Sequence, residues 1–407
     1  MRILYVLSEP CYPAVNGVRI PAYHAIRLMS RDNDLTLASL VSPECEPYDL
    51  KPLDSLCEKV ITVKLPRRHP ALIAFNALLR RETYFMERFR SERFRDQLKE
   101  MIAEFKPDVV HFDYILTTQY HNCAPPGAGT VASINDSITF SMENAFKQKL
   151  ERSLFGKIYR RCQYYQVRHF EKTFYPRFDI VHTMTENDAE FLRSLNPNIR
   201  TEAIPNGTFI EDFNGVADNL PTDHIVFVGR LSATTKLQPL LDFLNISWSK
   251  IRKVKPQAVF HIVGRKMEGF EPVIKIAEEL GGVKFEGFIE NLADVYSKAC
   301  ISIVPINKNS GLVNKAIEAM AAGLCVVGFH KTFEGIPEAK NGENCLAVGS
   351  FEQMGDVILD IMVNKEKQRA IQKAASETAV RCFSWESRRI RYQKMYEHAA
   401  NLTKSNL

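Results

Sequence analysis

The fold is decided by residues 301–323, which read ISIVPINKNSGLVNKAIEAMAAG. The apolar start predicts a buried strand, the polar run after it a turn, and the rest a helix that begins near Gly311. The first helical turn carries small apolar side chains, so its backbone N–H groups are uncovered. Unpartnered amides and the helix dipole attract phosphate. Glu318, two turns further on, can accept two hydroxyls of a ribose, so the segment predicts a site for a nucleotide diphosphate.

Outward from this stretch, short apolar runs alternate with longer helical patterns. A first series of strands is predicted over Ile3–Leu7, Leu35–Leu40, Lys59–Val63, Val109–Phe112, Thr130–Ile134, Ile180–Thr183 and Glu202–Ile204. A second series is predicted over His224–Val228, Ala258–Val263, Val283–Phe285, Ile301–Val304, Cys325–Gly328 and Cys345–Val348. Helices are predicted over Ile20–Ser30, Glu92–Phe105, Glu186–Leu195, Leu237–Arg252, Phe270–Leu280, Asn291–Ala299 and Leu312–Ala322. Such alternation is typical of α/β proteins whose parallel sheets are covered on both faces.

The two series predict two doubly wound domains. The run Ile204-Pro205-Asn206-Gly207 contains turn-forming residues and marks the junction. We expect a first domain over residues 1–204, a second over 205–383, and a C-terminal helical segment over 384–407. Residues 141–178 are predicted to form an additional helical insertion in the first domain.

Composition restricts the functional class. The chain has 407 residues and a formal net charge of +5, which does not argue for nucleic acid. Its nine cysteines are scattered without Cys-x-x-Cys or zinc spacing, so we expect free thiols in a reducing cytosol and no metal site. No apolar run reaches the roughly 18–20 residues of a membrane span. We expect a cytoplasmic protein, either soluble or peripheral at the inner membrane face.

The positive charge is concentrated in residues 60–180, which hold 20 Lys and Arg residues against 13 Asp and Glu residues. Aromatic residues lie among them. One interpretation is a set of solvated helix faces over an ordinary core. The other is a surface that meets anionic lipid or an anionic acceptor.

In the second half, several residues that could carry chemistry follow the predicted strands. Gly229 and Arg230 end the first of these strands, and Lys236 comes six residues later. Ligands of open α/β sheets lie at the carboxyl ends of strands, so the two cations can neutralise a diphosphate. Gly264 ends the next strand and Gly287-Phe288 the one after it, where glycine lets a ligand approach the backbone; ordinary turn glycines are the alternative.

In the first half, a loop containing Gly17 follows the first strand and lacks the Gly-x-Gly-x-x-Gly pattern of dinucleotide enzymes. Asn135 and Asp136 end the strand Thr130–Ile134, and His111 and Asp113 end another. Both pairs are predicted at the carboxyl edge of a parallel sheet, although polar residues there are often ordinary caps. Neither a Walker motif nor a Gly-x-Ser-x-Gly elbow occurs.

Taken in order, these pieces resemble the family 4 retaining glycosyltransferases of the GT-B fold, also called glycosyl transferases group 1. The resemblance covers nearly the whole chain. Its markers are Ile204-Pro205-Asn206-Gly207, Phe227-Val228-Gly229-Arg230 with Lys236, Ser310-Gly311 through Lys315 to Glu318-Ala319-Met320-Ala321-Ala322-Gly323, and Phe383-Ser384-Trp385. The family implies two Rossmann-like domains that face each other across a cleft. The nucleotide sugar is held mainly by the second domain and the acceptor by the first, and the final helix crosses back to the first domain.

The resemblance also implies roles. Glu318 would accept the ribose hydroxyls, while Arg230 and Lys236 would neutralise the departing diphosphate. The backbone amides of Gly311, Leu312 and Val313 would meet the phosphates and the sugar. Gly17 would lie close to the β-phosphate. Retention of the anomeric configuration in the family is described as front-face attack through an oxocarbenium-like transition state, in which the leaving phosphate accepts the proton of the acceptor. The resemblance implies no divalent metal and no other cofactor.

Two positions depart from the family pattern. Ser310 stands where many members have a glutamate that touches the donor sugar, and Asn135 stands where a histidine is common. Three hypotheses therefore stay open. The first is a retaining transferase that moves a sugar from a nucleotide diphosphate, by default UDP, to a glycan or lipid-linked acceptor. The second is a non-catalytic partner subunit, and the third is a sugar-nucleotide epimerase or phosphorylase on the same fold.

Overall fold

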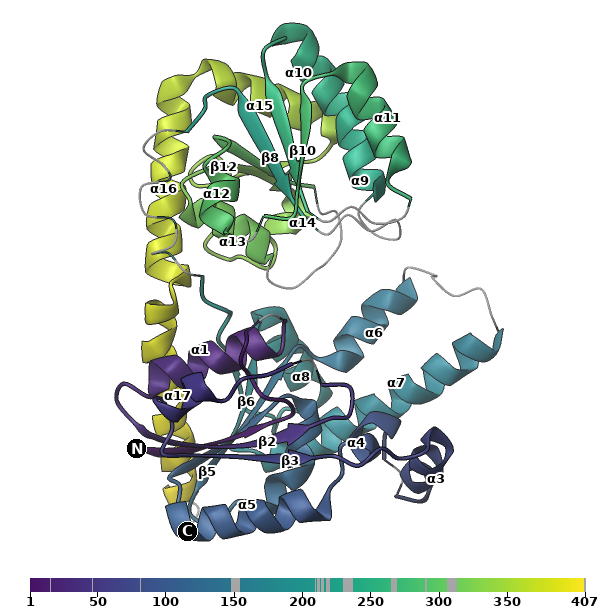
Figure 1. Ribbon diagram of the computed structural model, residues 1–407, viewed down its shortest axis with the longest axis vertical. Helices are drawn as coiled ribbons and strands as arrows, with labels where there is room; N and C mark the ends of the chain where they lie inside the picture. The colour runs from purple at the N-terminus through teal and green to yellow at the C-terminus, as the bar shows by residue number, and fades with distance from the viewer. Residues whose placement is uncertain are drawn as a thin grey trace. The chain divides into compact units, whose positions relative to one another are not determined.

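The structure is a computed structural model that describes residues 1–14, 16–45, 47–80, 82–147, 154–208, 210, 213, 216, 220–229, 237–264, 269–289, 291–305 and 313–405. The chain divides into two compact units. Unit 1 contains Met1–Pro205 and Arg388–Leu407, and unit 2 contains Asn206–Ser387. Figure 1 shows the elements of each.

Unit 1 is built on a seven-stranded parallel sheet with the order β3-β2-β1-β4-β5-β6-β7. The strands are β1 (Arg2–Leu7), β2 (Asp34–Val41), β3 (Lys59–Lys64), β4 (Val109–Asp113), β5 (Gly129–Asn135), β6 (Ile180–Thr183) and β7 (Thr201–Ala203). The order reverses between β1 and β4, where Ile3 pairs with Val109. This reversal is a topological switch point, the place where doubly wound sheets bind ligands beyond their carboxyl ends.

The helices of unit 1 connect these strands (Figure 1). They are α1 (Arg19–Met29), α2 (Lys51–Asp54), α3 (Pro70–Arg80), α4 (Tyr84–Arg88), α5 (Glu92–Phe105), η1 (Ile115–Cys123), α6 (Ile138–Lys147), α7 (Leu154–Phe174), η2 (Tyr175–Arg177), α8 (Glu186–Leu195) and most of α17 (Trp385–Ser405). The predicted insertion over 141–178 corresponds mainly to α6 and α7.

The C-terminal helix α17 packs against the unit 1 sheet through polar and close backbone contacts. The hydroxyl of Tyr396 lies 2.8 Å from that of Tyr5 and 3.0 Å from Nδ1 of His111. Gly129 lets the helix approach β5, because a Cβ there would lie 2.6 Å from the carbonyl carbon of Ala399. All three polar side chains are buried, so their hydrogen bonds fix the helix on the sheet without leaving polar groups unpaired.

Unit 2 is built on a six-stranded parallel sheet with the order β10-β9-β8-β11-β12-β13. The strands are β8 (His224–Val228), β9 (Val259–Val263), β10 (Val283–Gly287), β11 (Ile301–Val304), β12 (Cys325–Phe329) and β13 (Leu346–Val348). The helices are α9 (Leu237–Asp242), a π-helical segment η5 (Phe243–Trp248), α10 (Ser249–Val254), α11 (Glu271–Leu280), α12 (Leu292–Tyr296), α13 (Asn314–Ala321), α14 (His330–Phe333), α15 (Phe351–Val363) and α16 (Lys365–Phe383). The strand order reverses between β8 and β11.

Both faces of the unit 2 sheet are buried, which is why its strands are nearly continuous apolar runs. Ile225 and Phe227 of β8 face one core, formed largely with the helices from α9 to α11 and α15. Val226 and Val228 face the other core, formed with α12, α13 and α16. Alternate residues of one strand therefore hold helices on opposite sides of the sheet.

The predicted strands and the α/β fold class are confirmed in the described residues. All thirteen predicted strands occur, and both sheets are parallel. The helix expected to begin near Gly311 needs a correction, because α13 begins at Asn314. Val313 has ψ of 85°, outside the helical range, and so precedes the helix as its cap. Gly311 and Leu312 lie outside the described residues.

Candidate functional site

The carboxyl edge of the unit 2 sheet is the candidate site, since the strand order reverses there between β8 and β11. Five of the predicted site residues follow these strands but lie outside the described residues: Arg230, Lys236, Ser310, Gly311 and Leu312. The described members of the set are Gly229, Gly264, Gly287, Phe288, Val313 and Glu318.

Three predicted glycines lie together at this edge. Gly229 follows β8 and donates its N–H to the carbonyl of Val263 at 3.0 Å. Gly264 follows β9 and donates to the carbonyl of Gly287, the last residue of β10, at 2.8 Å. A Cβ at Gly287 would meet no atom within 4 Å, although its φ of 70° disfavours other residues. The three glycines therefore bring the ends of three adjacent strands together, and the backbone at Gly287 is open to a ligand.

Phe288 directly follows this glycine edge. Its side chain is 63% exposed. A ring in this place can stack on a planar group such as a nucleobase.

Among the described residues, no acceptor is seen for the first backbone amides of α13. Val313 is buried and supplies no side-chain cap to the helix. The N–H groups of Ala316 and Ile317 both donate to the carbonyl of Val313, at 2.9 and 3.4 Å. The amides of Asn314 and Lys315 precede these bonds, so the helix start retains the donor groups that an anion can use.

Glu318 lies one turn into α13, and two neighbours hold its carboxylate. The hydroxyl of Tyr296 donates to Oε2 at 3.1 Å, and Nζ of Lys315 lies 2.8 Å from the same oxygen. The Glu318 side chain is 14% exposed. In the described part of the chain no hydrogen bond to Oε1 is seen, so this oxygen can accept a ligand hydroxyl.

Tyr296 is a positioning residue that sequence reasoning did not single out as such. It ends α12, is fully buried and stands 22 positions from Glu318 in the chain. Burial, and then the adjacent Glu318 carboxylate, raise the pKa of Tyr296 well above its ordinary value. The phenol therefore keeps its proton and remains a donor to Glu318.

The predicted residues of unit 1 lie at the carboxyl edge of its own sheet. Gly17 is exposed just before α1, and a Cβ there would meet no atom within 4 Å. Asn135 ends β5 with φ of 63°, and its buried Oδ1 has no hydrogen-bond partner in the described structure. Asp136 is exposed, yet partial desolvation and the nearby Asp188 raise its pKa to about 6.

Further carboxylates lie near the switch point of unit 1. Asp113 ends β4 and is buried, and burial raises its pKa despite His111, whose Nε2 lies 3.8 Å from Oδ1. His111 itself is held by Tyr396, so it belongs to the packing of α17. In the loop after β1, Oε2 of Glu9 lies 2.7 Å from Nε of the buried Arg19. Asp113 is predicted from the sequence at this edge together with His111, whereas Glu9 is not, and only its position shortly after β1 could have marked it.

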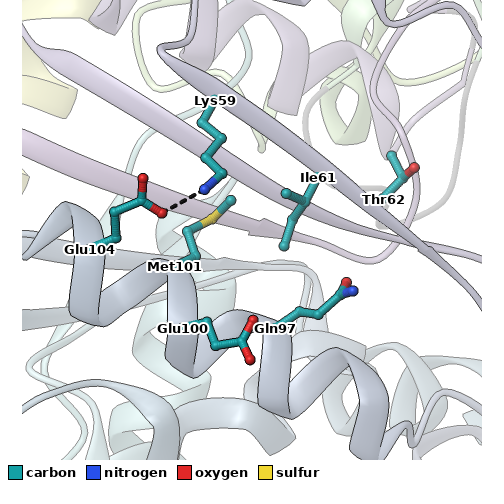
Figure 2. Close-up of a pocket in the computed structure, with 7 residues that line it drawn as sticks. All are labelled: Lys59, Ile61, Thr62, Gln97, Glu100, Met101 and Glu104. Carbon is teal, nitrogen blue, oxygen red and sulfur yellow. Dashed lines mark hydrogen bonds and ion pairs between the residues drawn. The ribbon is translucent and has the colours of Figure 1, made fainter.

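A separate cavity of about 370 Å³ lies between β3 and α5 (Figure 2). Its lining residues are Lys59, Ile61, Thr62, Gln97, Glu100, Met101 and Glu104. Nζ of Lys59, at the amino end of β3, lies 2.6 Å from Oε2 of Glu104, as Figure 2 shows. Lys59 and Glu104 neutralise each other, and they lie at the amino end of the strand, whereas doubly wound sheets bind ligands beyond the carboxyl ends. We therefore assign this cavity no function.

No group of three or more His, Cys, Asp or Glu side chains in the described part of the chain is arranged to bind a metal ion. Likewise, none of the helices in the described ranges is long and apolar enough to cross a membrane.

Comparisons with known proteins point to one family and one fold. Residues 222–364 match the family model of glycosyl transferases group 1. A 44.6 kDa protein of the cps region of Klebsiella pneumoniae is 23% identical over 336 residues, which cover 80% of this chain and 82% of that protein.

Solved structures extend the likeness to the whole chain. The sucrose-phosphate synthase of Thermosynechococcus elongatus has a TM-score of 0.67 at 19% identity, covering 99% of this chain and 100% of that one. HepE of Anabaena, in complex with UDP and glucose, has a TM-score of 0.63 at 14% identity, covering 98% and 99%. Residues 222–364 are therefore similar to the glycosyl transferases group 1 family, and the two parallel sheets of the chain have the GT-B fold.

Proposed function

We propose that the protein is a retaining, metal-independent glycosyltransferase. It moves a sugar from a nucleotide diphosphate donor, a UDP-sugar, to a glycan or lipid-linked acceptor. The observation that carries this proposal is the arrangement at the carboxyl edge of unit 2. There, three strand-end glycines from adjacent strands lie in the same unit as an uncapped helix whose Glu318 is held in place by Tyr296. The family match covers the same residues.

Each group has a role that its chemistry supports. Glu318 accepts the ribose hydroxyls, with Oε1 available and Oε2 anchored by Tyr296. The amides of Gly311, Leu312 and Val313 bind the phosphates, and Gly229, Gly264 and Gly287 let the nucleotide approach the backbone. Phe288 contacts the base. Arg230 and Lys236 neutralise the diphosphate as the bond to the sugar breaks, which stabilises the charge that develops in the transition state.

Unit 1 supplies the acceptor side in this proposal. Gly17 approaches the β-phosphate, and Ser310 of unit 2 contacts the donor sugar where many members of the family have a glutamate. Asn135 and Asp136 accept hydrogen bonds from hydroxyls of the sugars. The unpartnered Oδ1 of Asn135 supports this role, because a buried amide oxygen without a partner gains stability from a donor. The acceptor attacks from the face that the diphosphate leaves, and the leaving phosphate takes its proton.

The choice of UDP rests on similarity. HepE of Anabaena was solved in complex with UDP and glucose, and separately with UDP-glucose. The acceptor is proposed from chemistry alone. We also propose that the protein works in the cytoplasm at the inner membrane face, and that residues 60–180 meet an anionic membrane surface.

Donor turnover tests the proposal. Purified protein is incubated with labelled UDP-hexoses and UDP-N-acetylhexosamines over a panel of acceptors, and the products are separated. Lys236→Ala and Glu318→Ala should each lower turnover at least tenfold, which corresponds to about 1.4 kcal/mol of barrier. The matched control is Glu343→Ala, because Glu343 forms a similar i,i+3 pair with Lys340 on the exposed surface of unit 2.

The outcomes separate the hypotheses. Wild-type turnover in both site variants contradicts the proposal. Nucleotide binding without turnover over the whole panel indicates a partner subunit without activity. Release of an epimerised nucleotide sugar, or of a sugar phosphate, indicates one of the other reactions that this fold supports.

A further inference from the structure

Helix α3 exposes an apolar face that the described structure leaves uncovered. Four large side chains are more than half exposed: Leu72 at 51%, Phe75 at 58%, Leu78 at 74% and Leu79 at 67%. They occupy one side of the helix together with the exposed Ala71 and Ala74. Contiguous apolar surface of this kind on a folded protein marks an interaction site.

The opposite side of α3 already packs on unit 1. Ile73 and Ala77, one turn apart, are each 4% exposed and anchor the helix beside α4. Figure 1 shows α3 next to α4 at the margin of unit 1. The helix is therefore apolar on both sides, and a helix of that kind is stable in an apolar environment rather than in water.

A cationic cavity adjoins the helix. Its volume is about 630 Å³, and its charged lining residues are Lys64, Arg68, Arg80, Arg90, Arg93, Glu87 and Glu92. The buried Glu87 is shared by three of these arginines. Its Oε1 lies 3.1 Å from Arg68 Nη1, and its Oε2 lies 3.0 Å from Arg90 Nε and 3.6 Å from Arg80 Nε.

Positive charge predominates around α3. Residues 64–80 contain four Lys and Arg residues and no Asp or Glu. One buried carboxylate among three guanidinium groups leaves net positive charge, even though Glu82 also contacts Arg90. Lys64 and Arg93 add to it, and both are exposed. This cavity is suited to a phosphate that carries apolar chains.

We propose that α3 and the adjoining cavity form a docking site for an anionic phospholipid surface. The exposed leucines and Phe75 enter the boundary between headgroups and acyl chains, and the cavity holds a phosphate headgroup. An apolar helix face flanked by arginines binds anionic bilayers through buried area and charge attraction together.

A second copy of the chain is the less suitable occupant. A two-fold symmetric contact through α3 would bring the same patch onto itself. The cations of the two cavities would then approach each other with few carboxylates to offset them, which opposes association. An anionic bilayer, in contrast, matches both the apolar face and the charge.

The docking site rests on the proposed contact of residues 60–180 with an anionic membrane and locates that contact at α3, and it uses none of the residues proposed for glycosyl transfer. Vesicle binding measures it directly. Wild-type protein is sedimented or floated with vesicles of phosphatidylcholine alone and with vesicles containing phosphatidylglycerol. We expect binding to the anionic vesicles only, and weaker binding as salt is raised.

Two kinds of variant identify the site. The double substitution Leu78→Ser/Leu79→Ser should weaken binding at least tenfold, and Lys64→Glu/Arg93→Glu should do the same. The control Val363→Ser alters an apolar residue that is 68% exposed in unit 2 and should bind as the wild type does. UDP affinity measured on the same samples should stay unchanged in all three, which also shows that the variants are folded.

Binding of the wild type to neither kind of vesicle, or to both kinds equally well, would overturn the docking site. Binding of the Leu78→Ser/Leu79→Ser variant as tightly as the wild type would do the same. A lipid-free dimer that this variant converts to a monomer, without vesicle binding, would assign the face to a second copy. Loss of donor turnover with intact vesicle binding would instead count against the proposed function alone.

Discussion

Replacing Tyr296 by Phe tests whether a single buried hydroxyl positions the carboxylate of Glu318, which we propose binds the ribose. The substitution removes the 3.1 Å hydrogen bond to Oε2 of Glu318 and keeps the ring, whose centroid lies 5.8 Å from that of Phe213. Since the raised pKa of Tyr296 keeps the phenol protonated, the wild-type hydroxyl donates throughout any practical assay range. The change therefore alters one donor and little else.

The expected magnitude follows from the contacts of Glu318. A hydrogen bond to a charged group contributes roughly 1.5–3 kcal/mol. Glu318 keeps Lys315 as a partner at 2.8 Å, and its partial exposure lets water replace some of the lost bond. We expect about 1 kcal/mol to appear as lost nucleotide affinity, which is about a fivefold rise in the Kd for UDP.

Calorimetric titration with UDP measures this effect in a double-mutant cycle of Tyr296→Phe and Glu318→Ala. If the hydroxyl acts through the carboxylate, removing it in the Glu318→Ala background costs little further affinity. Tyr120→Phe is the control, because that buried hydroxyl donates to the carbonyl of Phe89 at 2.7 Å in unit 1. A Tyr296→Phe protein that binds UDP as the wild type does, or a loss that persists in full without Glu318, refutes the reasoning.

Three other substitutions have defined outcomes. Gly17→Ala should leave the melting temperature unchanged, because its Cβ meets no atom, while slowing transfer a few-fold in initial-rate assays; a lower melting temperature would contradict the open surroundings. Gly129→Ala places a Cβ 2.6 Å from the backbone of Ala399 and should lower stability by about 1–3 kcal/mol in urea unfolding, so an unchanged midpoint would argue against the close contact with α17. Folding raises the pKa of Asp136 to about 6, so above pH 6 the ionised carboxylate lowers the free energy of unfolding. This loss of stability is recovered as the pH falls from about 6 toward the ordinary pKa of an aspartate, about 4. Asp136→Asn should therefore raise the melting temperature more at pH 8 than at pH 4, and equal shifts at both would show that the carboxyl does not titrate in this way.

The strands can be predicted from the sequence because both sheets are parallel and covered on both faces. A strand in such a sheet needs apolar side chains on both sides, so it appears as a short apolar run such as Ile301–Val304. Turn-forming residues after each run then mark the carboxyl edge. This is how Gly229, Gly264 and Gly287 can be placed near one another before the structure is known.

What the sequence leaves open depends on contacts between distant residues. The hydrogen bond from Tyr296 to Glu318 joins two helices that are separated by β11, and no local pattern reports it. The start of α13 at Asn314 depends on the backbone angles of Val313, since valine by itself is compatible with a helix. The raised pKa of Asp136 arises from partial desolvation and, to a lesser degree, from Asp188, 52 positions away in the chain. Arg230 and Lys236 stay predictions, because they lie outside the described residues.

Binding of UDP and of its 2′-deoxy and 3′-deoxy analogues to the wild type and to Glu318→Ala tests the central claim most directly. The claim predicts that the wild type loses at least about tenfold in affinity when a ribose hydroxyl is missing, and that Glu318→Ala binds all three nucleotides with nearly equal, weaker affinity. Equal binding of UDP and both deoxy analogues by the wild type, or the same discrimination in Glu318→Ala, would contradict it.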